Sequence, residues 1–341
     1  MRRSADYWSR PGAGGAGEPD LGCRLIMPRP VIVNQLGSEV GAALAAHSSR
    51  PHVREQEIGN APWLVGDSDI LLTRPHPSWQ NAPGVTPPEW PGRLRWVQVA
   101  STGVDWFPRW MMQGPLVTCG RGHHAAAIAE YVMTAILLYE KRLDQVSIHS
   151  QEAWRRHALG TLEGRTLGLA GYGAIGRAVA IRARAFGMRL AAWRRAGWDN
   201  EEPDIIKASS LAELASLSDH LLLALPLTDA TRHCVNASVL GVARPGLHLI
   251  NIARGGLVDQ TALLAALDED HVRFATLDVT DPEPLPAGHP IYTHPRIRLT
   301  PHISWSGQDS GKRLTEQILA NLTAYTQGGT LNNTVDPIRG Y

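Results

Sequence analysis

Several features are scarce or absent in this 341-residue sequence. It has three cysteines, Cys23, Cys119 and Cys234, which are too few and too widely spaced to indicate a disulfide framework or a metal site such as zinc. The formal net charge is +1, so the composition indicates neither a nucleic-acid partner nor an acidic surface as partner. No run of about 18 apolar residues occurs, and we therefore expect no membrane span. Together these absences predict a cytoplasmic protein.

The first segment, residues 1–29, lacks a regular apolar spacing and also lacks the apolar core of a secretory signal. Its glycine- and proline-rich stretch, 10–19, predicts a disordered extension. The whole chain has 43% hydrophobic and 19% charged residues, which is ordinary for a folded protein. At this length we expect two domains, each large enough to bury a core.

A glycine-rich segment organises the centre of the chain. The apolar run 166–170 predicts a buried strand, which leads into Gly171-Tyr172-Gly173-Ala174-Ile175-Gly176 and then into an amphipathic helix at about 175–186. In this setting the first glycine permits a tight turn, the second lets the backbone approach a pyrophosphate, and the third lets the helix pack closely. The helix N-terminus offers N–H groups to phosphate. A dinucleotide site is favoured; a turn without a ligand and a methyl-donor site are the alternatives.

Apolar runs and turn residues predict that strands and helices alternate along the chain. In the first part we expect strands at 31–33, 69–73, 95–99 and 116–118, a helix at 38–46 and a loop at 75–91. After a long helix at 125–143 we expect strands at 166–170, 189–193, 220–225, 247–252, 274–278 and 297–299, with helices at 211–216, 259–267 and 308–327. This order predicts an α/β protein with a small parallel domain and a doubly wound nucleotide-binding sheet.

Three further motifs each follow an expected strand. Arg254 comes first, at a strand's carboxyl end, where open α/β sheets bind ligands, and its planar guanidinium suits a carboxylate. Asp278 and Glu283 follow the next strand, and His302 follows the one after that. Each has a plainer interpretation: an arginine that ties down a loop, a solvated acidic loop, and a structural histidine. Their order after a dinucleotide loop favours a common active site.

Together these motifs resemble the D-2-hydroxyacid dehydrogenase family. The matching pieces are Gly171-x-Gly173-x-x-Gly176, Asn251-x-Ala253-Arg254-Gly255, Asp278-Val279 with Glu283-Pro284, and Thr300-Pro301-His302. The resemblance implies a Rossmann-like doubly wound parallel sheet inserted into a smaller flavodoxin-like α/β substrate domain. It places the substrate domain at 30–118 and 308–341 and the dinucleotide-binding domain at 119–307. It also implies a homodimer built on the cofactor domains, with the helix 125–143 in the interface.

The resemblance assigns a role to each motif. His302 would protonate the substrate carbonyl during reduction, Glu283 would orient this histidine and favour its charged form, and Arg254 would clamp a small 2-oxo acid and polarise its carbonyl. The backbone amides of 101–104 would bind the carboxylate from the other domain, and Asp278 would contact the nicotinamide amide. The expected catalytic residues are Arg254, Glu283 and His302. The expected cofactor-binding residues are Gly171, Tyr172, Gly173, Ala174, Ile175, Gly176, Trp193, Arg194, Arg195, Leu225, Pro226, Thr231, Ile252, Ala253, Arg254, Asp278 and His302. The expected substrate-binding residues are Arg74, Ser101, Thr102, Gly103, Val104, Arg254 and His302.

Two positions depart from the family pattern. Members that prefer NAD carry an acidic residue after the strand that follows the glycine-rich helix, whereas this chain has Trp193-Arg194-Arg195. Arginine at this point suits the 2′-phosphate of NADP(H), so NADP(H) is favoured, and NAD(H) with two solvated arginines is the alternative. The second departure is His123-His124, which stands where the family often has an amide.

The leading hypothesis is an NADPH-dependent reductase of a 2-oxo acid such as glyoxylate or hydroxypyruvate, because Trp193-Arg194 and Trp305 resemble that subgroup. A second hypothesis is a phosphoglycerate dehydrogenase in which Arg74, at a strand end, serves the substrate phosphate. Glu283 stands where the formate dehydrogenase branch has glutamine, which argues against that activity. A cofactor-sensing corepressor of the same family remains open, since such proteins keep the same catalytic triad.

Overall fold

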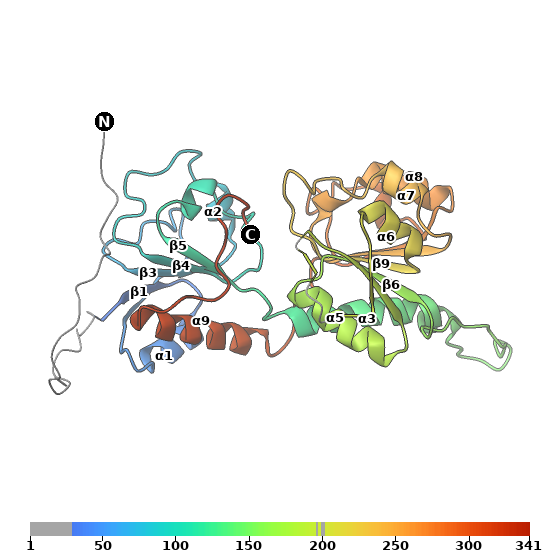
Figure 1. Ribbon diagram of the computed structural model, residues 1–341, viewed down its shortest axis with the longest axis horizontal. Coiled ribbons are helices and arrows are strands. Elements are labelled where there is room, and N and C mark those ends of the chain that lie inside the picture. Colours follow the sequence, from blue (N-terminus) through green and yellow to red (C-terminus); the bar gives the residue numbers. More distant parts are fainter. Residues whose placement is uncertain (1–28, 196, 199–201) are drawn as a thin grey trace, which may run out of the picture.

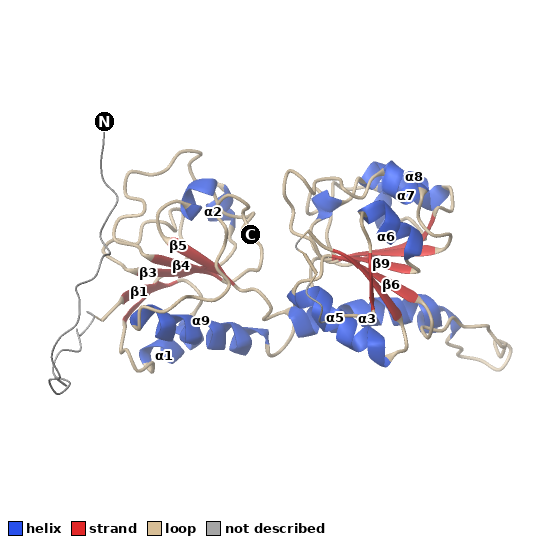
Figure 2. Ribbon diagram, in the orientation of Figure 1, coloured by secondary structure: helices blue, strands red, loops and turns tan. Residues whose placement is uncertain are grey.

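The computed structural model describes residues 29–195, 197–198 and 202–341, which form two lobes (Figure 1). The predicted disordered extension lies outside the described residues except for Arg29. Each lobe contains one parallel β-sheet with helices on both faces (Figure 2). Within the described residues, no helix is long and apolar enough to cross a membrane.

The first lobe is built on a five-stranded sheet in the order β2-β1-β3-β4-β5. Its strands are β1 (Val31–Asn34), β2 (His52–Glu55), β3 (Ile70–Thr73), β4 (Trp96–Val99) and β5 (Leu116–Cys119). The helices α1 (Ser38–Ala45) and α9 (Ser310–Thr326) cover one face, and α2 (Pro77–Gln80) with the 3-10 helix η1 (Arg109–Met112) packs over the other. All residues of β3 and β4 are buried, as expected for central parallel strands. This strand order is flavodoxin-like.

The second lobe is built on a seven-stranded sheet in the order β12-β11-β10-β9-β6-β7-β8. Its strands are β6 (Thr166–Ala170), β7 (Arg189–Trp193), β8 (Ile205–Lys207), β9 (His220–Leu223), β10 (Leu247–Asn251), β11 (Val272–Leu277) and β12 (Ile297–Leu299). One face carries α3 (Ala125–Lys141) and α5 (Ala174–Ala185), and the other carries α6 (Leu211–Leu217), α7 (Ala237–Gly241) and α8 (Gln260–Asp268). The connecting segments contain α4 (Leu143–Val146), η2 (Gly255–Leu257) and η3 (Pro290–Tyr292). The order of the chain reverses between β6 and β9, so the sheet is doubly wound, and the predicted fold class is confirmed.

The second lobe is inserted into the first along the chain. The C-terminal helix α9 returns to the first lobe, where Leu314, Ile318 and Leu322 share a core with Ile32 and Leu44. The domain limits given above remain a proposal; β5 ends and α9 begins close to the two proposed crossing points.

The structure differs from the expected elements mainly at the sheet edges. The edge strands β2 and β8 were not predicted, because their residues are largely exposed and show no apolar run. The expected loop 75–91 contains α2, whose first turn is capped by His76 and begins at a proline, a combination that favours a helix start. The long helix ends at Lys141, two residues before the predicted end, because Arg142 adopts a left-handed backbone conformation with φ of 47°.

Candidate active site

The candidate site lies at the carboxyl edge of the second sheet, where its loops meet the first lobe. Parallel strands deliver their carboxyl ends to one edge, so the loops after β6, β10, β11 and β12 converge although they are far apart in the sequence. An ion pair between Arg254 of the second lobe and Asp105 of the first lobe closes the site from the other side.

The glycine-rich loop between β6 and α5 has the geometry that a dinucleotide needs. Gly171 has φ of 101°, and a Cβ atom on it would lie 2.5 Å from the carbonyl oxygen of Ala224. A Cβ on Gly176 would lie 2.5 Å from the Gly171 oxygen, so the close packing of helix on strand requires this glycine too. Gly173, in contrast, has no other atom within 4 Å of its Cβ position. The bare backbone at the start of α5 therefore fits a pyrophosphate.

The residues after β7 fit the adenosine end of such a cofactor. The guanidinium carbon of Arg194 lies 5.4 Å from the ring centroid of Trp198, and that of Arg195 lies 5.1 Å from the ring of Tyr341. A guanidinium held over an aromatic ring by cation–π attraction keeps N–H donors in its own plane that can reach a phosphate. Tyr172 of the glycine-rich loop is buried, its ring centroid lies 5.8 Å from that of Trp198, and the guanidinium of Arg177 lies over its ring.

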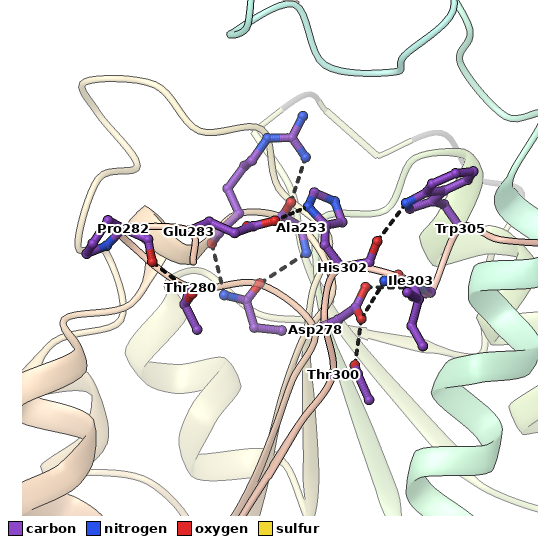
Figure 3. A network of polar contacts seen from close by, with 12 residues as sticks. Ala253, Asp278, Thr280, Pro282, Glu283, Thr300, His302, Ile303 and Trp305 are labelled. Atoms are coloured by element: carbon purple, nitrogen blue, oxygen red, sulfur yellow. Dashed lines mark hydrogen bonds and ion pairs between the residues drawn. The ribbon is translucent and has the colours of Figure 1, made fainter. Parts of the chain in front are cut away.

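A histidine–carboxylate pair occupies the loops after β11 and β12. The Nδ1 atom of His302 lies 2.6 Å from Oε1 of Glu283, a short charge-assisted contact (Figure 3). Within the described residues, no hydrogen bond engages the opposite ring nitrogen, Nε2. His302 also has φ of 53°, a conformation that is uncommon for residues other than glycine and is typical of functional positions.

Asp278 holds this histidine loop in place. Its buried carboxylate accepts hydrogen bonds from the Thr300 hydroxyl at 2.6 Å and from the backbone N–H groups of Ile303 and Ser304 at 2.9 Å each (Figure 3). The N–H of His302 donates to the Asp278 carbonyl at 2.8 Å. Three of the roughly four acceptor positions of a carboxylate are therefore occupied. The side chain expected to contact the nicotinamide amide thus organises the His302 loop in this structure.

The loop that carries Arg254 is shaped by its neighbours in the motif. The Asn251 side chain accepts from the Ala253 N–H at 3.1 Å and donates to the Arg254 carbonyl at 2.9 Å, which folds the chain sharply after β10. A Cβ on Gly255 would overlap the backbone of Thr280, so only glycine fits there. These contacts give a physical reason for the Asn-x-Ala-Arg-Gly pattern.

Arg254 is anchored by Asp105, a site residue that the sequence analysis missed. Its Nε and Nη2 atoms donate to the two Asp105 carboxylate oxygens at 2.9 Å each, and Nη1 donates to the Ala253 carbonyl at 2.7 Å. Burial opposes ionisation of Asp105, but the hydrogen bond and charge of Arg254, with a smaller contribution from His302, hold the pKa of this carboxyl below its usual value. The only available signal was its position directly after the expected substrate loop 101–104.

The expected residues are brought together to different degrees. Gly103 lies so close to the Arg254 guanidinium that a side chain there would overlap it, and Ser101 donates to the Gly103 carbonyl at 2.6 Å. In the loop after β9, Thr231 donates to the Pro226 carbonyl at 2.7 Å, and Leu225 packs beside Gly171. Arg74 follows β3 and is exposed; in the described part of the chain, no hydrogen bond or ion pair joins it to the other site residues.

The two unexplained histidines lie where the chain enters the second lobe at α3. Their ring centroids are 3.6 Å apart, and the His124 ring lies 5.3 Å from that of Trp305. Trp305 in turn donates to the His302 carbonyl at 2.7 Å. Burial, followed by the charge of His123, lowers the pKa of His124 to about 4, so this ring is neutral at physiological pH. The pair therefore packs against the histidine loop as an uncharged support.

Fold and site together define an oxidoreductase that binds a dinucleotide at a doubly wound sheet. Residues 133–304 match the family model described as "D-isomer specific 2-hydroxyacid dehydrogenase, NAD binding domain". The chain is 32% identical over 263 residues to a glyoxylate/hydroxypyruvate reductase A of Serratia proteamaculans, covering 73% of this chain and 82% of the relative. It is 34% identical over 234 residues to a glyoxylate reductase of Aeropyrum pernix, covering 65% and 70% of the two chains.

A similar structure is that of a D-isomer specific 2-hydroxyacid dehydrogenase from Xanthobacter autotrophicus Py2 in complex with NADPH and MES. Its TM-score is 0.75 at 25% identity, with 92% of this chain and all (100%) of that chain covered. The chain belongs to the D-2-hydroxyacid dehydrogenase family, and the predicted resemblance is confirmed. It is an NAD(P)-dependent dehydrogenase or reductase of 2-hydroxy and 2-oxo acids.

Proposed function

We propose that this enzyme uses NADPH to reduce a small 2-oxo acid of the glyoxylate or hydroxypyruvate type. The observation that carries the proposal is that Arg254 and the His302–Glu283 ion pair follow parallel strands that end at the same sheet edge as the strand before the glycine-rich loop. A guanidinium and an imidazole–carboxylate pair suit a substrate that has a carboxylate and an adjacent carbonyl to be protonated. The relatives of Serratia proteamaculans and Aeropyrum pernix carry the names of such reductases.

The chain's own residues would share the work as follows. Arg254 and the backbone amides of 101–104 bind the substrate carboxylate, and Arg254 also polarises the carbonyl. His302 delivers the proton on Nε2 to the carbonyl oxygen, while Glu283 at Nδ1 fixes the orientation of the ring. When bound, the nicotinamide cofactor supplies the hydride. Asp278 keeps the His302 loop in the required shape through its three hydrogen bonds.

NADP(H) is the proposed cofactor because Arg194 and Arg195 follow β7 at the position where the adenosine ribose would lie. Two guanidinium groups there favour a 2′-phosphate over two ribose hydroxyls. NADPH is also the cofactor named for the Xanthobacter structure. NAD(H) remains the alternative that cofactor titration would reveal.

We also propose a homodimer through the second lobe. The segment after α3 extends away from that lobe in Figure 1 and exposes apolar side chains, with Leu143 57% and Trp154 78% exposed. Burying these groups against a second copy would remove apolar surface from water. The molar mass in solution, measured by light scattering, tests this proposal, and a monomer at micromolar concentration would contradict it.

The function is tested by the rates of NADPH and NADH oxidation with a panel of 2-oxo acids, with products identified by mass spectrometry. We expect the highest kcat/KM for glyoxylate or hydroxypyruvate with NADPH. Oxidation of 3-phosphoglycerate as the best reaction would instead favour the phosphoglycerate dehydrogenase hypothesis, in which the exposed Arg74 would bind the substrate phosphate. Tight NADPH binding without turnover of any 2-oxo acid would favour a cofactor-sensing role.

A further inference from the structure

The contacts of the Arg254 guanidinium leave one particular edge of it for a ligand. A guanidinium has five N–H donors in one plane. Asp105 accepts one each from Nε and Nη2, and the Ala253 carbonyl accepts one from Nη1. The remaining two donors, one on Nη1 and one on Nη2, are parallel and lie at the end of the group. Such a pair matches two adjacent oxygens of an acid.

The carboxylate that fixes this orientation comes from the other lobe. Asp105 follows β4 of the first lobe, whereas Arg254 follows β10 of the second. The pair is partly shielded from water, with 25% of the Arg254 side chain and 37% of the Asp105 side chain exposed. A second pair between the lobes, Arg109 with Asp229, is 3.8 Å long and almost fully exposed. The Asp105 contact is the one that orients a residue of the site.

We propose that Asp105 is a positioning residue for the reaction. It holds Nε and Nη2 of Arg254 and thereby turns the two free donors, on Nη1 and Nη2, toward the 2-oxo acid. The inference rests on the proposed function, because it assigns a substrate to the free edge. It also couples the lobes to the chemistry, since Arg254 has this orientation only when the first lobe lies against the second. Asp105 itself does not touch the reacting atoms.

The test is the variant Asp105→Ala, assayed with NADPH and the best 2-oxo acid. Misplacement of a group that positions the substrate costs up to about 10²-fold, so we expect kcat/KM to fall by roughly 10- to 100-fold. The Kd of NADPH, measured by fluorescence titration, should remain unchanged. Added formate should restore part of the lost rate, because a small carboxylate fits the space left by the side chain and can re-form the bonds to Nε and Nη2. Formate should not accelerate the wild-type enzyme.

Three further variants separate positioning from a structural role. Asp229→Ala removes the same charge from the exposed pair and should leave kcat/KM unchanged. Asp105→Asn keeps the size of the side chain but points an amide donor at a guanidinium donor, so it should lose activity without rescue by formate while its melting temperature stays unchanged. If the alanine variant does not fold, this loss at constant melting temperature carries the test. In the Arg254→Lys variant, the further change Asp105→Ala should lower kcat/KM only a little. Both substitutions remove the same interaction between these two side chains, so their effects should not add.

Other results would overturn the inference. A higher kcat/KM in Asp105→Ala would mean that this carboxylate competes with the substrate for Arg254. An unchanged kcat/KM, or a loss that formate does not reverse and that follows the melting temperature, would mean a structural role. Failure of the proposed function gives a different pattern: the wild-type enzyme would reduce no 2-oxo acid, and the inference would fall with it.

Discussion

Replacing Arg194 by aspartate tests the proposed cofactor preference. Arg194 is half-buried, has its guanidinium over the ring of Trp198 and follows the strand that ends at Trp193. For two unit charges about 4 Å apart, the interaction ranges from about 1 kcal/mol in water to about 4 kcal/mol near a protein surface. Reversal of the charge replaces attraction to a 2′-phosphate by repulsion, and we take about 2 kcal/mol for a partly exposed pair. This corresponds to a roughly 30-fold weaker Kd for NADPH.

NADH lacks the 2′-phosphate, so its affinity for Arg194→Asp should change little. Fluorescence titration of both cofactors measures the two dissociation constants directly. Arg189→Asp is a matched control, because Arg189 is an exposed residue at the opposite end of the same strand, β7. The wild-type preference for NADPH should also decrease as salt is added, since salt screens partly exposed charges. Equal losses for NADPH and NADH in Arg194→Asp would refute the reasoning.

Three other changes have defined outcomes. Glu283→Gln replaces the charged partner 2.6 Å from His302 by a neutral amide, so kcat for reduction should fall roughly 10- to 100-fold while the Kd of NADPH stays constant. Asp278→Asn removes an acceptor from the His302 loop, so both kcat and the melting temperature should fall. In a chemical denaturation series, the free energy of unfolding should fall by about 1–3 kcal/mol. In the folded chain the pKa of His124 is lowered to about 4 from an ordinary 6.5. Between pH 4 and 6.5 the unfolded chain therefore binds more protons at this residue than the folded chain does. Stability should therefore fall as the pH drops from about 6.5 toward 4, and His124→Asn should lose less melting temperature than wild type over that range; equal losses would contradict the assignment.

The sequence predicts the second sheet well because its strands are short apolar runs bounded by turn residues. β6, β7 and β12 have the predicted limits, and the glycine-rich loop occupies the predicted turn. The edge strands β2 and β8 carry no such signal, since exposed strands do not need apolar side chains. A helix inside a proline-rich loop, α2, depends on a local cap that the composition conceals.

The part of the candidate site that the sequence predicts consists of residues that directly follow a strand. Arg254, Glu283 and His302 each follow a parallel strand, and such strands end at one edge, so their convergence could be expected. The Asp105 contact could not, because it depends on how two lobes pack against each other. The hydrogen bonds of Asp278 to Thr300 and Ser304 could not be predicted either, because they depend on the exact path of a loop.

The central claim is that His302 protonates a 2-oxo acid while Arg254 binds it. The most direct test measures, in one preparation each of wild type and His302→Ala, the Kd of NADPH and the rate of glyoxylate or hydroxypyruvate reduction at saturating cofactor. We predict an unchanged Kd and a loss of roughly 10²- to 10⁴-fold in kcat, the usual contribution of a general acid. A His302→Ala enzyme that binds NADPH and retains near wild-type kcat would contradict the account.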